Sequence, residues 1–289
     1  GCEARSSARL SMERLPAVDV LGQVVAQRTA VARRLASVRR VVAIASGKGG
    51  VGKSLLTANL AAALATDASR VGVLDADIHG PSAALMLGAR GQRPKLGPQG
   101  ARPAIGVCDV RVMSMDLFLK DDDSAVRWRH YGGLADDTFV WRGTLEANVL
   151  REFLADTDWG ELDYLLVDMP PGADRFDTLL RLLPELGGAA MVTTPSEASV
   201  LVVRRAAAAA QHSGARILGL VENMAATSGP GRGRDLADDL GIPFLASVPF
   251  DPDLARNTEA GRPGVLIDPG APGARAILEL ANRLKGILA

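Results

Sequence analysis

Two lysines and a serine stand in a glycine-rich stretch, GKGGVGKS, at residues 47–54. It matches the pattern G-x-x-x-x-G-K-[ST] through Gly47, Gly52, Lys53 and Ser54. Glycines let the backbone turn several N–H groups toward a phosphate, and the positive end of a following helix strengthens the attraction. In this pattern Lys53 reaches the β- and γ-phosphates and the Ser54 hydroxyl is a ligand of Mg²⁺. The stretch therefore predicts a nucleotide site.

The residues on either side supply the context that this pattern needs. An apolar run with Val41, Val42 and Ile44 precedes the loop and is typical of a buried strand. Leucine and alanine recur at helical spacing after it, from Leu55 to Leu64. Only five of the 33 basic residues are lysines, and two of them lie in the loop, where a compact ammonium suits a phosphate. We expect nucleotide contacts from the whole loop: Gly47, Lys48, Gly49, Gly50, Val51, Gly52, Lys53, Ser54 and Leu55.

Aspartates end two further apolar runs, at residues 70–75 and 163–168. In an open α/β sheet a carboxylate at the C-terminal end of a strand faces the ligand crevice. Asp168, followed by Met-Pro-Pro-Gly, has the form of a Walker B acid that holds Mg²⁺ through a water. Asp75 and Asp77 lie in the string DADIHGPS, where the alternatives are catalysis and a helix cap.

Strand and helix patterns alternate along the rest of the chain. Strands are expected at 107–115, 189–194, 217–223 and 243–248, and helices at 144–154, 197–212 and 274–288. Residues 88–103 read as a loop, and Cys108 as a core residue of its strand. The prediction is a doubly wound, mostly parallel α/β sheet of about seven strands with the nucleotide at their C-terminal ends.

The domain prediction is a P-loop domain at 39–289 after an N-terminal extension at 1–38. The extension carries an amphipathic helix at 18–38 whose basic residues form either a solvated face or a partner surface. Residues 121–143, which contain two Trp-Arg pairs, are expected to cap the site or a dimer interface.

Composition limits the kinds of protein and the cellular compartment that fit this chain. The 289 residues carry a formal net charge of zero, so no charge bias indicates nucleic acid. Two cysteines, Cys2 and Cys108, are too few for a disulfide framework or a four-ligand metal site. No apolar run reaches the length of a membrane span, and the first residues lack the apolar region of a signal peptide. We therefore expect a cytoplasmic protein.

Several separate strings resemble the Mrp/ApbC-type ATPases of the ParA/MinD superfamily (SIMIBI class), which are iron–sulfur cluster carriers. They are GKGGVGKS, DADIHGPS, WRG, DWGELDYLLVDMPPG, VTTP, VENM and VPFDPDL, and the resemblance runs from about residue 41 to about residue 264. It implies slow Mg-dependent ATP hydrolysis by a nucleotide-sandwich homodimer, with assembly factors or client proteins as partners.

The same resemblance assigns roles to single residues. In this deviant Walker A loop Lys48 crosses to the partner's phosphates, in the manner of an arginine finger. Asp77 orients or activates the attacking water, and Asp75 supports the metal shell around Ser54 and Asp168. Asn223, Pro249 and Asp251 frame the adenine.

The chain departs from the family at one place. Family members carry C-x-x-C shortly after VENM, which supplies two thiolates per subunit to a bridging iron–sulfur cluster. This chain has no cysteine after Cys108, and Ser or Gly cannot replace a thiolate as a ligand of iron. We therefore expect an ATPase without its own cluster ligands.

Three outputs remain open at this point. The first is a cluster-assembly ATPase that relies on a partner's thiolates. The second is a MinD/ParA-like positioning switch, in which ATP-driven dimerisation exposes a membrane- or nucleoid-binding face. The amphipathic helix at 274–288 is its membrane candidate, although packing of that helix on the core is the favoured interpretation. The third is a scaffold that binds nucleotide and scarcely hydrolyses it.

Overall fold

A twisted sheet of eight strands forms the centre of the computed structural model, which describes residues 20–119, 138–172, 175–183, 186–226 and 231–289. In order across the sheet the strands are β10 (Phe244–Pro249), β9 (Ile217–Ala225), β8 (Gly188–Thr193), β1 (Val38–Ser46), β7 (Leu162–Asp168), β2 (Val71–Asp75), β6 (Arg111–Met113) and β5 (Ala104–Ile105). All neighbouring pairs are parallel except β5 with β6. The predicted doubly wound, mostly parallel fold is confirmed, with β5 as an added antiparallel edge strand.

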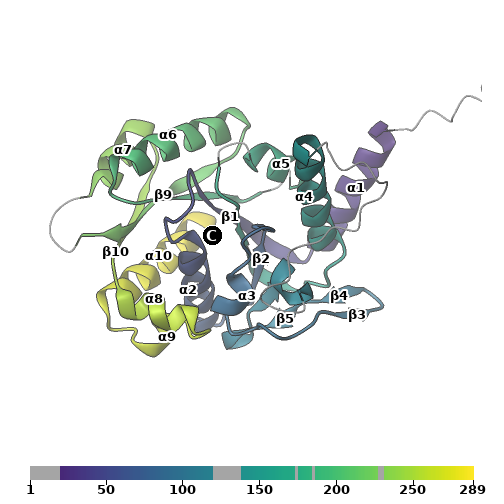
Figure 1. The fold of residues 1–289 in the computed structure, drawn as a ribbon, viewed down its shortest axis with the longest axis horizontal. Helices are drawn as coiled ribbons and strands as arrows, with labels where there is room; N and C mark the ends of the chain where they lie inside the picture. The colour runs from purple at the N-terminus through teal and green to yellow at the C-terminus, as the bar shows by residue number, and fades with distance from the viewer. Residues whose placement is uncertain (1–19, 120–137, 173–174, 184–185, 227–230) are drawn as a thin grey trace, which may run out of the picture.

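Helices cover both faces of this sheet (Figure 1). One face carries α2 (Lys53–Thr66), α3 (Ala83–Met86), α8 (Pro252–Glu259), α9 (Gly264–Ile267) and α10 (Pro272–Leu288). The other face carries α1 (Val20–Leu35), α4 (Thr138–Ala155), α5 (Arg175–Leu182), α6 (Glu197–His212) and α7 (Arg232–Leu240). Because both faces are covered, the central strands are almost continuously apolar, as parallel strands require.

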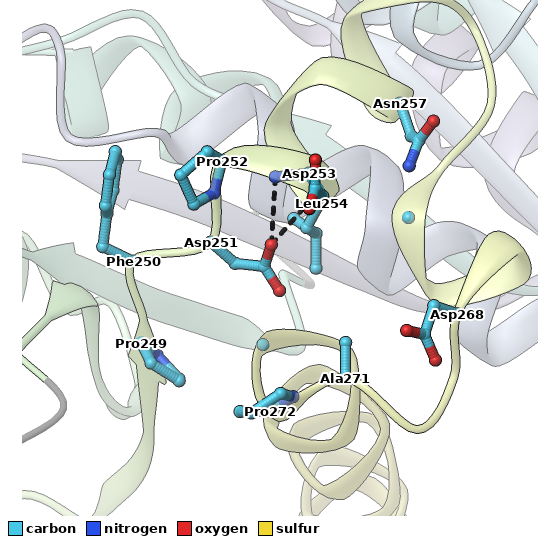
Figure 2. A pocket seen from close by; sticks show the side chains of 12 residues that line it. Pro249, Phe250, Asp251, Pro252, Asp253, Leu254, Asn257, Asp268, Ala271 and Pro272 are labelled. Carbon is cyan, nitrogen blue, oxygen red and sulfur yellow. Dashed lines mark hydrogen bonds between the residues drawn. The ribbon is translucent and has the colours of Figure 1, made fainter.

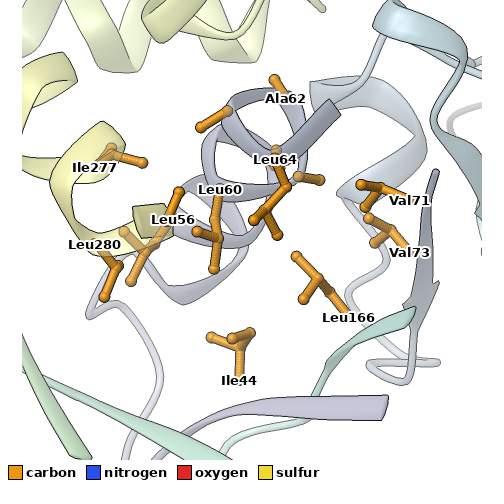
Figure 3. Packing of buried hydrophobic residues seen from close by; sticks show 14 of the residues in the cluster. Ile44, Leu56, Leu60, Ala62, Leu64, Val71, Val73, Leu166, Ile277 and Leu280 are labelled. Carbon is orange, nitrogen blue, oxygen red and sulfur yellow. The ribbon is translucent and has the colours of Figure 1, made fainter. Parts of the chain in front are cut away.

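The core around α2 shows how the nucleotide loop is supported from behind (Figure 3). Leu56, Leu60 and Leu64 of α2 are buried against the sheet, where Ile44 and Leu166 face them. On the other side α10 contributes Ile277, Leu280 and Leu284 to the same cluster. The apolar face of α10 is therefore part of the core.

Three predictions for residues 88–115 are wrong. Residues 107–109 form a 3₁₀ turn (η1, Val107–Asp109) instead of a strand. Cys108 and Asp109 have positive φ angles of 52° and 59°, which an extended strand does not allow, so β6 begins only at Arg111. Cys108 is exposed rather than part of the core. The expected loop at 88–103 contains a hairpin of β3 (Lys95–Gly97) and β4 (Gly100–Arg102). Each strand has only three residues, so the alternation of polar and apolar side chains is too short to recognise in the sequence.

The remaining segments bear on the domain prediction. A second 3₁₀ turn, η2 (Met115–Phe118), follows β6, and α4 begins six residues before the predicted helix, at Thr138. Helix α1 packs against α4, with Val31 and Leu35 buried. Residues 1–19 and most of the segment 121–143, including Trp128, lie outside the described residues, so their predicted roles stay predictions. In the described part of the chain, no helix is long and apolar enough to cross a membrane.

Candidate functional site

The loop between β1 and α2 has the backbone shape of a phosphate-binding loop. Gly50 and Gly52 both have φ near 75°, a left-handed conformation that favours glycine. A Cβ on Gly47 would lie 2.6 Å from a backbone carbon of α6, and a Cβ on Gly52 would overlap the Asn223 side chain. The Ser46 hydroxyl donates to the carbonyl oxygen of Lys48 at 2.9 Å and fixes the first turn. The glycines are therefore needed for both conformation and close packing.

Lys53, at the start of α2, is joined to the acid at the end of β7. Its ammonium Nζ lies 2.5 Å from Asp168 Oδ1, with Lys53 7% exposed and Asp168 fully buried. Thr57, one turn further along α2, donates its hydroxyl to the same oxygen at 3.1 Å. The second oxygen, Oδ2 of Asp168, is buried without a hydrogen-bond partner in the described structure. Lys53 Nζ also lies 3.4 Å from the Ser54 hydroxyl. A buried carboxylate oxygen with free lone pairs fits a hard divalent cation or its bound water.

Asp75 organises the loop that follows β2. Its Oδ2 accepts hydrogen bonds from the backbone of Ser82 (2.9 Å) and Ala83 (3.0 Å) and from the Ser114 hydroxyl (3.1 Å). Its Oδ1 accepts from the backbone N–H of Asp77 at 3.1 Å. Both oxygens thus hold residues 77–83 in place.

Asp75 stands directly opposite Asp168 in the register of β2 and β7, so two carboxylates lie close together. Burial is the main cause that raises the pKa of Asp75, and the nearby carboxylate of Asp168 adds to it, bringing the pKa to about 7. The bonds from Ser82 and Ala83 and the charge of Lys53 act in the opposite direction. Because the two carboxylates share the positive charge of one lysine, Lys53, the site can accept a further cation.

Asp77 and Lys48 lie at the rim of the site. Asp77 is half-buried, and its Oδ1 accepts from the backbone N–H of Gly80 at 3.1 Å. Lys48 is also half-buried, with Nζ 3.4 Å from the hydroxyl of Ser196, the N-cap of α6. Each keeps part of its polar group open to solvent, as a contact to a substrate requires.

The three residues predicted to frame adenine lie on two adjoining strands and the loop that follows the second one. Asn223 is buried near the end of β9 and donates from Nδ2 to the carbonyl oxygen of Val51 at 2.9 Å. Pro249 ends the neighbouring β10, and Pro249 and Asp251 line a hollow of about 320 Å³ between the β10–α8 loop and the start of α10 (Figure 2). Asp251 Oδ1 caps α8 by accepting from the backbone N–H groups of Asp253 and Leu254. Asn223 thus supports the glycine loop, and Asp251 supports the start of α8.

Two residues of this site were missed in the sequence. Thr57 stands four positions after Lys53, so both lie on one helix face and meet Asp168 together. Ser114 follows β6 and ends a strand, as Asp75 and Asp168 do. The sequence signal for Thr57 was its spacing of four residues from Lys53, and the signal for Ser114 was its position at the end of a predicted strand.

No iron or other soft-metal site is evident in the described residues. They contain no group of three His, Cys, Asp or Glu side chains placed to hold a metal ion. Cys108, the one cysteine among them, is exposed on η1 and its thiol pKa is raised, mainly by partial burial. The segment 227–230, where the family's cysteine pair is expected, lies outside the described residues and contains Thr, Ser, Gly and Pro.

The parallel sheet, the glycine loop at the end of β1 and the Lys53–Asp168 pair define a P-loop nucleotide-binding protein of the ParA/MinD type. The family described as ParA, NUBPL iron-transfer P-loop NTPase, matches residues 37–285. The chain belongs to this family.

Similar proteins agree with this placement. The chain is 37% identical over 263 residues to an iron–sulfur cluster carrier protein of Saccharolobus solfataricus, covering 87% of this chain and 84% of that protein. It is 38% identical over 266 residues to the human cytosolic Fe-S cluster assembly factor NUBP2, covering 86% and 93%.

Solved structures share the fold. A nucleotide-binding protein of Archaeoglobus fulgidus in complex with ADP is 31% identical, with a TM-score of 0.68, covering 85% of this chain and 95% of that one. The cell division ATPase MinD of Pyrococcus furiosus, at 24% identity and a TM-score of 0.64, covers 86% and 99% and shows the fold alone.

Proposed function

We propose that this protein binds Mg-ATP, hydrolyses it slowly as a homodimer and serves iron–sulfur cluster assembly in the cytoplasm. The observation that carries the proposal is the buried Lys53–Asp168 ion pair at the end of a loop whose Gly50 and Gly52 have left-handed φ angles. One oxygen of Asp168 has no hydrogen-bond partner in the described structure. The A. fulgidus protein, which resembles this chain, was solved with ADP. The cytosolic and cluster-assembly roles named for the relatives support the setting.

The phosphates would be held by two kinds of positive group. Backbone N–H groups of residues 47–54 and the start of α2 face the β- and γ-phosphates, and Lys53 releases part of its contact with Asp168 to reach them. Lys48, held near Ser196 in a single chain, would turn across the homodimer to the partner's phosphates. Stabilising charge on the transferred phosphoryl group is the main task of such a site.

Magnesium would be held by Ser54 directly and by Asp168 through water, with Asp75 completing the outer shell. When bound, the ion neutralises charge between the β- and γ-phosphates. Asp75 keeps residues 77–83 in one conformation, and Asp77, the half-buried acid on that loop, accepts a hydrogen bond from the attacking water. Asn223, Pro249 and Asp251 would lie along the nucleobase.

The test is steady-state ATPase activity with separate measurement of ATP binding. Lys53→Ala is expected to abolish binding and hydrolysis, whereas Asp77→Asn is expected to keep binding and lower kcat. Lys48→Ala should lower kcat and weaken ATP-dependent dimerisation in analytical ultracentrifugation. Unchanged rates in all three variants would reject the assignment and favour a nucleotide-binding scaffold.

We further propose that the cluster is handled with a partner's thiolates. The chain has no cysteine after Cys108, and Cys108, the one cysteine in the described ranges, is exposed. Anaerobic reconstitution with iron and sulfide should therefore leave the isolated protein without iron while ATP binding is intact. About four irons per dimer with a thiolate–iron absorption band would show that Cys108 or Cys2 supplies ligands.

The alternative of a MinD/ParA-like positioning switch has less support. It relied on α10 as the membrane-binding helix, but Ile277, Leu280 and Leu284 of α10 are buried against α2 and the sheet. Releasing them would expose part of the core.

A further inference from the structure

The hairpin of β3 and β4 is a surface element that the nucleotide site does not use. The backbone N–H of Ala101 donates to the carbonyl oxygen of Asp156, and the N–H of Asp158 donates to that of Ala101, both at 2.8 Å. These bonds attach β4 beside the segment that leads into the N-terminal end of β7, at the opposite edge of the sheet from the glycine loop. In Figure 1 the hairpin projects away from α2 and from α8 to α10.

Positive charge collects on this hairpin. No acidic residue occurs between Asp77 and Asp109, and the cations of that stretch are Arg90, Arg93, Lys95 and Arg102. Arg90 is paired with Asp116, its Nε 3.3 Å from Oδ2. The other three are exposed, and none forms an ion pair with the part of the chain that the structure describes. Within residues 78–108 every charged side chain is therefore positive, while two carboxylates, Asp156 and Asp158, adjoin β4 through the bonds to Ala101.

Two of these cations face each other. Lys95 of β3 stands directly opposite Arg102 of β4 in the register of the hairpin. Like charges at directly opposed positions destabilise a strand pair. The arrangement brings two positive side chains to one place, which suits contact with an anionic surface.

An exposed apolar side chain follows Lys95 in β3 and points to the other face of the hairpin. Leu96 of β3 is 90% exposed, more than any other large hydrophobic residue in the described structure. A single exposed leucine needs no explanation, but this one lies beside Lys95 on a projecting hairpin and contributes nothing to the core.

Backbone pairing with another strand is disfavoured here. Pro94 and Pro98 flank β3 and have no N–H to donate, so the free edge of β3 offers a very short ladder. The edge of the main sheet is also covered, because the Gln92 side chain donates to the carbonyl oxygen of Ile105 and accepts from its N–H, at 2.7 and 3.0 Å. An occupant must therefore be recognised by the exposed side chains.

We propose that the β3–β4 hairpin docks the protein reversibly on an anionic lipid bilayer. The hairpin approaches along the free edge of β3, so that Leu96 on one face enters the boundary between headgroups and acyl chains while Lys95 and Arg102 on the other face, with Arg93, reach lipid phosphates. Single-stranded nucleic acid fits less well, because no aromatic residue on which bases could stack occurs between His79 and Phe118. The proposal is independent of the proposed ATPase.

The test is co-sedimentation of the full chain with vesicles of phosphatidylcholine and phosphatidylserine, and with vesicles of phosphatidylcholine alone. The wild-type protein should bind only the vesicles with phosphatidylserine, and less as salt is raised. Neutralising Lys95 or Arg102 to Gln should weaken binding about fivefold each. Leu96→Ser should weaken it while leaving its salt dependence intact.

A matched control carries the same residue types elsewhere: Ile267→Ser with Arg262→Gln and Arg275→Gln, all exposed on the face of α9 and α10. This variant should bind vesicles as the wild type does, and retained ATP binding should show that every variant is folded. The proposal would be overturned if the wild-type protein did not bind vesicles with phosphatidylserine, or if the hairpin variants bound those vesicles as well as the wild type does. Hairpin-dependent binding of polyglutamate without vesicle binding would also overturn it, in favour of an acidic protein partner.

Discussion

Asn223 and Val51 are 172 positions apart in the chain, yet the amide of Asn223 donates to the carbonyl oxygen of Val51 at 2.9 Å inside the protein. The bond ties the end of β9 to the glycine loop, and the same amide fills the space that a Cβ on Gly52 would need. The loop is therefore held in its phosphate-binding shape from the neighbouring strands as well as from α2.

Asn223→Ala should loosen the loop. It leaves the Val51 carbonyl without its buried donor, which costs about 1–3 kcal/mol. We expect a lower free energy of unfolding in urea and about tenfold weaker ATP binding by titration calorimetry. Ile267→Ala, at the exposed end of α9, is the control. Equal affinities for wild type and Asn223→Ala would mean that the loop keeps its shape without this bond.

The two loop glycines that share a left-handed φ should differ in their tolerance of alanine. Gly50 and Gly52 share φ near 75°, but a Cβ on Gly50 meets no atom within 4 Å, whereas one on Gly52 collides with Asn223. Gly50→Ala should cost only the backbone strain, about 1–2 kcal/mol. Gly52→Ala should cost more and abolish ATP binding. Thermal unfolding and ATP titration compare the two, and equal losses would contradict the role of close packing.

Lys53 and Asp168 should be strongly coupled in stability. Removing one partner of a buried ion pair leaves an uncompensated charge, at a cost of about 3–5 kcal/mol. Lys53→Met and Asp168→Leu should each destabilise the protein, and the double variant should be less destabilised than the sum. Urea unfolding of the four proteins gives the coupling free energy. Additive losses would show that the pair is not coupled in solution.

Stability should fall as pH rises toward neutrality because of Asp75. Its pKa is raised from 3.8 to about 7 in the folded protein, so between these values the folded state holds a proton that the unfolded state has lost. The unfolded state then binds fewer protons, and the free energy of unfolding decreases with rising pH across that window and levels off above it. Asp75→Asn, which keeps an acceptor oxygen, should flatten this part of the curve in urea unfolding at a series of pH values. A wild-type curve without the decline would contradict the raised pKa.

The sequence alone determined the local parts of this protein. The strand–loop–helix around residues 47–54 was predictable because its pattern is contiguous and glycine conformation is a local property. Helix α6 was placed at its observed bounds because its N-cap serine and apolar spacing are also local signals. The acids Asp75 and Asp168 were found because each ends an apolar strand.

Only the tertiary structure decided how those parts meet. Asp75 lies opposite Asp168 because β2 and β7 are neighbours in the sheet. The local sequence of a strand does not indicate which other strand it will pair with. The exposure of Cys108 follows from a backbone turn that packing imposes, and the burial of α10 follows from the apolar surface of α2 that it covers. Strand order and burial depend on contacts between residues far apart in the chain, so they are settled by the packing of the whole domain rather than by any one segment.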